Sequence, residues 1–75
     1  MIVTTNTRRD AERLVRRDVE YSSAKAWSTE YLGWASIQRK QYFNSKRELI
    51  CSISNILDMK AKRTKGYQIW IADSN

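Results

Sequence analysis

The most regular pattern of apolar and polar positions lies between Ser45 and Lys65. Five apolar residues recur there at the spacing of a single helix face: Leu49, Ile50, Ile53, Ile56 and Leu57. The segment begins with Ser45-Lys46-Arg47-Glu48, which has the form of a capping box. Gly66 follows it and is able to adopt the left-handed conformation that ends many helices. The pattern therefore predicts a helix over residues 45–65.

Two further helices are predicted upstream of this segment. The first covers residues 7–21, where Asn6 or Thr7 offers an N-cap and Asp10 follows Thr7 three residues later, as in a capping box. Its apolar face is formed by Ala11, Leu14, Val15 and Val19. The second covers residues 24–42, and its shared face is formed by Trp27, Tyr31, Trp34, Gln38 and Tyr42.

The apolar faces of these two helices would not coincide on one straight helix. At ~100° per residue they point roughly 170° apart. Two arrangements are compatible with this. The chain bends near Ser22 and Ser23, where a serine can cap a new helix, or it runs straight and buries one face in a partner subunit. We favour the bend.

The two ends of the chain are β-prone. Met1–Thr5 is rich in β-branched residues. In residues 67–72, Tyr67, Ile69 and Ile71 alternate with Gln68, Trp70 and Ala72, the period of a half-buried strand. These segments either pair antiparallel within the chain, or the C-terminal one pairs with its copy in a second chain. The expected fold is thus mostly α, a small α+β domain over residues 1–75. Three helices (7–21, 24–42 and 45–65) and short terminal strands build it.

Composition limits the chemistry that the chain can perform. A 75-residue domain has a marginal core, and neither a disulfide nor a zinc site is expected because Cys51 is the only cysteine and histidine is absent. A homodimer would supply the missing support and is left open. Without a histidine base or a nucleotide-binding motif, we expect no enzyme activity and no cofactor. No stretch approaches the ~20 apolar residues of a membrane span, so we expect a cytoplasmic protein.

Charge points to an anionic partner. Fourteen Lys and Arg against eight Asp and Glu give a net charge of +6 and a pI near 9.8. Arginines line the polar face of residues 7–21, and lysines gather at the end of residues 45–65. Lys46 and Arg47 would oppose the helix dipole unless an anion binds there. The candidate contacts are Arg9, Arg13, Arg16, Arg17, Lys46, Arg47, Lys60, Lys62, Arg63 and Lys65.

Three aromatic residues are candidates of a different kind. Trp27, Tyr31 and Trp34 most simply form part of the core, but tryptophan and tyrosine also concentrate at protein interfaces.

The lead hypothesis is a non-catalytic, regulatory nucleic-acid-binding protein that contacts duplex DNA through phosphates, with Arg47 as a candidate base reader. The alternative is a small modulator, an inhibitor or adaptor of phage or plasmid type, that docks an acidic surface of a larger protein. Exposed tryptophans in an apolar patch would favour the alternative.

Overall fold

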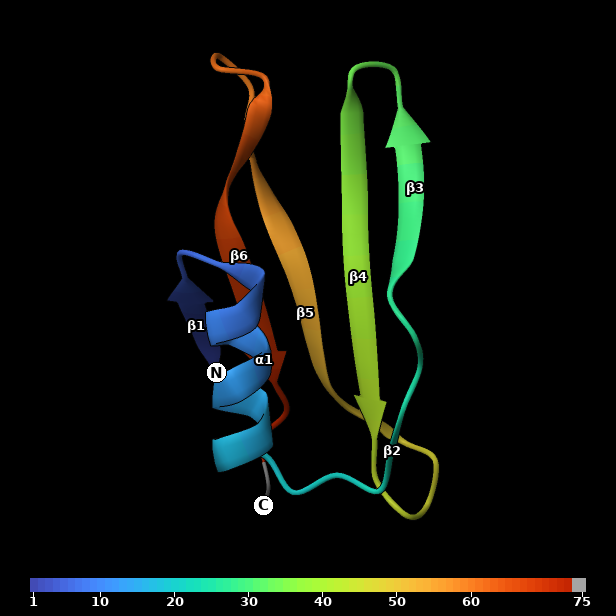
Figure 1. Cartoon of the computed structure of the whole chain (residues 1–75). Coiled ribbons are helices and arrows are strands. Elements are labelled where there is room, and N and C mark those ends of the chain that lie inside the picture. The colour runs from blue at the N-terminus through green and yellow to red at the C-terminus, as the bar shows by residue number, and fades with distance from the viewer. Residues whose placement is uncertain (74–75) are drawn as a thin grey trace.

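The computed structural model describes residues 1–73 and is mostly β-sheet. Over these residues the elements follow in the order β1 (Ile2–Thr5), α1 (Arg8–Asp18), β2 (Ser23–Ala24), β3 (Ser28–Leu32), β4 (Ala35–Phe43), β5 (Leu49–Asp58) and β6 (Arg63–Ile71). All strands join one antiparallel sheet in the order β1-β6-β5-β4, and β2 and β3 both pair with β4 (Figure 1). The prediction of a three-helix domain was wrong, because only the first of its helices forms.

Residues 45–65 form strands because their apolar residues also recur at a period of two, and this strand pattern prevails over the helical one. Cys51 and Ile53 alternate with Ser52 and Ser54, and the first two are fully buried. Isoleucine is stiff at χ1, and serine competes with the helix backbone for hydrogen bonds, so both weaken the helical alternative. Once a helix covers one face of the sheet, the period-two pattern places Cys51 and Ile53 in the core, whereas Leu49 at the start of the strand is 40% exposed.

The expected capping box is instead the turn between β4 and β5. The Asn44 Oδ1 atom accepts hydrogen bonds from the backbone amides of Lys46 at 2.9 Å and Glu48 at 3.0 Å. Arg47 occupies the left-handed region with a φ of 64°. A side chain that bonds its own backbone two residues on is typical of a turn, and here it closes the β4–β5 hairpin.

Neither of the two glycines ends a helix. Gly33 has a φ of 62° and lies in the two-residue loop between Leu32 and Ala35, where a hairpin favours glycine. Gly66 lies inside β6, and a Cβ atom there would come 2.9 Å from the backbone carbonyl oxygen of Thr5. The close approach of β1 therefore explains Gly66.

The terminal strands pair with each other within the chain. In the antiparallel ladder of β1 and β6, Ile2 lies opposite Trp70 and Thr5 lies opposite Tyr67. The N-terminal amino group donates a hydrogen bond of 2.9 Å to the carbonyl of Ile71. Both ends of the described chain are thus tied to the same edge of the sheet.

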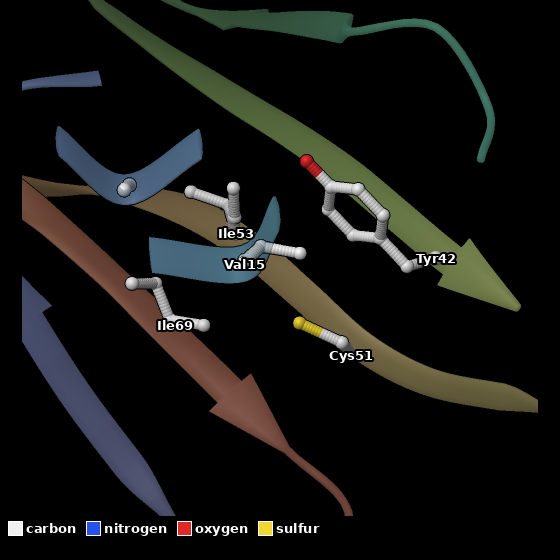
Figure 2. Packing of buried hydrophobic residues seen from close by; sticks show 6 residues of the cluster. Val15, Tyr42, Cys51, Ile53 and Ile69 are labelled. Atoms are coloured by element: carbon white, nitrogen blue, oxygen red, sulfur yellow. The ribbon is translucent and has the colours of Figure 1, made fainter. Parts of the chain in front are cut away.

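The core lies between α1 and one face of the sheet. The Thr7 hydroxyl accepts a hydrogen bond of 3.1 Å from the Asp10 amide, as expected of the N-cap, and the helix ends at Asp18. Its buried side chains are Ala11 and Val15. They pack against Tyr42, Cys51, Ile53 and Ile69 (Figure 2). Burial raises the pKa of the Cys51 thiol to about 11 and that of the Tyr42 hydroxyl to about 12.

The helix covers only part of the sheet. It lies beside β1 and β6, and the β3–β4 and β5–β6 hairpins extend beyond it and separate from each other (Figure 1). The described ladder between β4 and β5 reaches only to Arg39 and Ser54. Beyond that pair the Asn55 side chain takes over, because its carboxamide bonds the backbone of β4 at Gln38 and Ser36. The fold thus presents two hairpin ends away from the core.

Candidate nucleic-acid interface

The end of the β5–β6 hairpin is a compact turn held by its own backbone. Asp58 and Arg63 form the last pair of the ladder. The Asp58 Oδ1 atom accepts hydrogen bonds from the amides of Lys60 at 3.0 Å and Ala61 at 3.1 Å. Lys62 completes the turn with a φ of 53°. The shape of this end therefore depends on local bonds and not on packing against the core.

Four cations concentrate on this end of the hairpin. Lys60, Lys62, Arg63 and Lys65 are all exposed. Within the described chain, none of the four lies within 4.0 Å of a carboxylate. Hydrogen bonds from the amides of Ala61 and Lys60, together with the nearby cations, lower the pKa of Asp58. We define these four residues as the hairpin cluster. Its positive charge faces solvent, with the Asp58 carboxylate as a nearby negative charge.

The second basic group is the outer face of α1. Arg9, Arg13, Arg16 and Arg17 are exposed there, as expected. Arg17 makes a bidentate contact with Asp18 at 2.8 and 2.9 Å, and this hydrogen bonding lowers the pKa of that carboxylate. Arg13 lies 3.9 Å from Asp10. Among the described residues, Arg9 and Arg16 therefore have no ion pair.

Lys46 and Arg47 form a third, separate group. They lie in the exposed turn between β4 and β5, and not at a helix N-terminus as expected. Because β5 runs from this turn to the β5–β6 turn, the two residues lie at the opposite end of the strand from the hairpin cluster (Figure 1). The structure therefore brings the four hairpin cations together but leaves the predicted contacts in three groups.

The three aromatic candidates divide between core and surface. Trp27 is half-buried, and its indole Nε1 donates a hydrogen bond of 2.6 Å to the Glu12 carboxylate. The Arg8 guanidinium lies 3.9 Å from the centre of the Trp27 ring. Trp27 thus fastens the segment before β3 to α1. Tyr31 and Trp34 belong to the β3–β4 hairpin and are 78% and 47% exposed.

The sheet face that α1 leaves uncovered contains polar residues that the sequence analysis did not select. The strand register places Thr4, Gln68, Ser54, Arg39 and Ser28 in one row across the sheet. The row has no carboxylate, and its cation is Arg39. The alternation of Ser52 and Ser54 with buried residues was the signal for this face. The helical interpretation of residues 45–65 concealed it.

Comparison of the chain with protein-family models, with curated proteins and with solved structures gives no match. Within residues 1–73, no helix is long and apolar enough to cross a membrane. The same residues contain no group of three or more side chains suited to hold a metal ion. Charge distribution and the shape of the hairpins therefore carry the functional argument.

Proposed function

We propose that this protein binds duplex DNA without catalysis, in a regulatory role, and contacts phosphates through the hairpin cluster and the exposed arginines of α1. The observation that carries the proposal is the hairpin cluster itself. Four cations that have no ion pair within residues 1–73 lie in six consecutive positions, at the end of a hairpin that extends beyond the helix. Duplex DNA presents about one negative charge per 1.7 Å of its axis, which suits such a dense cationic group.

The dimensions of the molecule agree with this proposal. Its longest axis measures 38 Å. One turn of B-DNA is about 34–36 Å long. The cations of α1 and those of the hairpin cluster therefore lie within about one duplex turn of each other. Lysine supplies a mobile point charge and arginine a planar fork, and both suit phosphate oxygens.

Salt dependence tests the proposal directly. The hairpin cluster with Arg9 and Arg16 supplies six cations that form no ion pair among the described residues. They would neutralise about six phosphates, which gives a slope of log affinity against log salt near −5. Affinity for a duplex should therefore fall about 10³-fold between 50 and 200 mM salt. Failure to bind duplex DNA even at 50 mM salt would refute the proposal.

Matched double variants locate the contact. Lys60→Ala with Arg63→Ala removes two hairpin charges and should lower the magnitude of the slope by about 2. Lys25→Ala with Lys46→Ala removes two exposed charges outside the proposed interface and should leave the slope nearly unchanged. Equal effects of both pairs would show that net charge alone governs binding.

A second candidate function is supported by the β3–β4 hairpin. Tyr31, Leu32 and Trp34 are 78%, 52% and 47% exposed at its end. Large exposed apolar side chains favour docking on another protein, the role of a small inhibitor or adaptor. Capture of the same protein partner from a lysate before and after nuclease treatment, with loss on Trp34→Ala, would favour this function over DNA binding.

A further inference from the structure

The width of the β5–β6 hairpin matches one groove of a DNA duplex. Neighbouring strands lie about 4.8 Å apart, so the row of five strands across the sheet is about 19 Å broad between its outer strands. The major groove is about 12 Å wide and admits a two-stranded ribbon, whereas the minor groove is only about 6 Å wide. The hairpin end alone, and not the full sheet, has a width that fits the major groove.

The reach of the hairpin end also matches that groove. The β4–β5 ladder stops at Ser54, and Asn55 makes the last bonds to β4. From Asn55 to Asp58, the last residue of β5, the strand advances about 10 Å, at about 3.3 Å per residue. The major groove is about 8.5 Å deep. The free end of the hairpin is therefore long enough to reach the base edges.

The residue at the start of the turn is apolar. Met59 is 70% exposed, although the hydrogen bonds of the Asp58 carboxylate to Lys60 and Ala61 fix the backbone around it. Its side chain is thus an exposed apolar group on an ordered turn that also contains Lys60 and Lys62. In the major groove, thymine presents a C5 methyl group, which is an apolar contact that the minor groove lacks.

We propose that the β5–β6 hairpin enters the major groove end first, with Met59 against thymine methyl groups and the hairpin cluster on the flanking phosphates. The inference rests on the proposed DNA binding and adds the groove and the element that enters it. Lys60 and Lys62 in the turn, with Arg63 and Lys65 at the start of β6, reach the phosphates beside the groove. Met59 adds a preference for thymine through this apolar contact and not through hydrogen bonds to the bases.

Covalent groove blocks test which groove is entered. One duplex carries a propynyl group at pyrimidine C5, which fills the major groove, and the other carries an ethyl group at guanine N2, which fills the minor groove. Because both blocks are uncharged, phosphate attraction is unchanged. We expect the wild-type protein to lose about tenfold in affinity on the first duplex and less than about twofold on the second. The Lys60→Ala, Arg63→Ala variant should show a smaller difference between them.

Replacement of thymine by uracil tests the role of Met59, since it removes only the C5 methyl. Wild-type affinity should fall about fourfold, the value for one apolar carbon returned to water. Met59→Ala should bind both duplexes equally. Leu32→Ala, which shortens an exposed apolar side chain on the other hairpin, is the matched control and should retain the wild-type difference.

The outcomes separate the two proposals. Wild-type binding that the minor-groove block weakens more, or that both blocks weaken equally, overturns major-groove entry and leaves DNA binding intact. Equal affinity of the wild type for thymine and uracil duplexes overturns the role of Met59. Absence of duplex binding at 50 mM salt overturns this inference together with the proposed function.

Discussion

Asn55 replaces the backbone ladder at the point where β4 leaves β5. Its Oδ1 atom accepts a hydrogen bond of 2.9 Å from the Gln38 amide. Its Nδ2 atom donates to the Ser36 carbonyl at 2.7 Å and to the Thr64 hydroxyl at 3.1 Å. One side chain thus joins β4, β5 and β6 near the ends of both hairpins. We therefore expect Asn55→Ala to destabilise the protein more than other substitutions in the polar part of the sheet.

The magnitude follows from the three bonds. The Thr64 hydroxyl is on an exposed residue and can bond to water after the substitution, whereas Gln38 and Ser36 are half-buried. Counting only the two bonds to β4, at about 1 kcal/mol each, gives a loss of about 2 kcal/mol. A domain of 75 residues has a stability of only about 4–11 kcal/mol, so this is a large share.

Urea unfolding measures the loss. With an m-value of about 1 kcal/mol/M, the midpoint of Asn55→Ala should fall by about 2 M. Hydrogen exchange gives a local test, since the Gln38 amide should lose protection more than the amides of the buried residues of β5. The control is Ser54→Ala on the uncovered face, which should change stability by less than about 0.5 kcal/mol. A midpoint for Asn55→Ala equal to that of the control would refute this account of the β4–β5 junction.

Three further substitutions test the packing. Gly66→Ala should cost about 1–3 kcal/mol in urea unfolding, because its Cβ would meet the Thr5 carbonyl oxygen; an unchanged midpoint would contradict that contact. The raised pKa of Cys51 means that the folded state holds the thiol proton more tightly, so stability should fall as pH rises from about 9 to about 11. The fall in stability over this pH range should be less steep in Cys51→Ala, which has no thiol to titrate. Trp27→Phe removes the indole donor to Glu12 and should cost about 1–2 kcal/mol, whereas retention of full stability would show that this bond contributes little.

The helix α1 could be predicted from the sequence because its signals are local. Thr7 provides the cap, and Ala11 and Val15 recur at helical spacing with arginines on the other side. All of these contacts lie within a few residues. The helix was nevertheless expected to continue to residue 21, whereas it ends at Asp18.

The candidate site was predictable in part. Lys60, Lys62, Arg63 and Lys65 are close in sequence, so any fold would keep them near one another. Their place at the end of a hairpin was not predictable, because it depends on the pairing of β5 with β6. The separation of Lys46 from this group was predictable, because a helix over residues 45–65 would also have placed Lys46 at the opposite end from these four residues.

The strands were decided by the tertiary structure. Ile53 fits both a helical period and a period of two, and the local sequence does not discriminate between them. The choice comes from partners far along the chain: Lys40 and Ile69 lie opposite Ile53 in the sheet, and α1 covers it. By itself the sequence determined the net charge, the position of the basic segments and the local helix. The sheet, its uncovered face and the two projecting hairpins followed from non-local pairing, because buried area and backbone hydrogen bonds outweigh local helical preference.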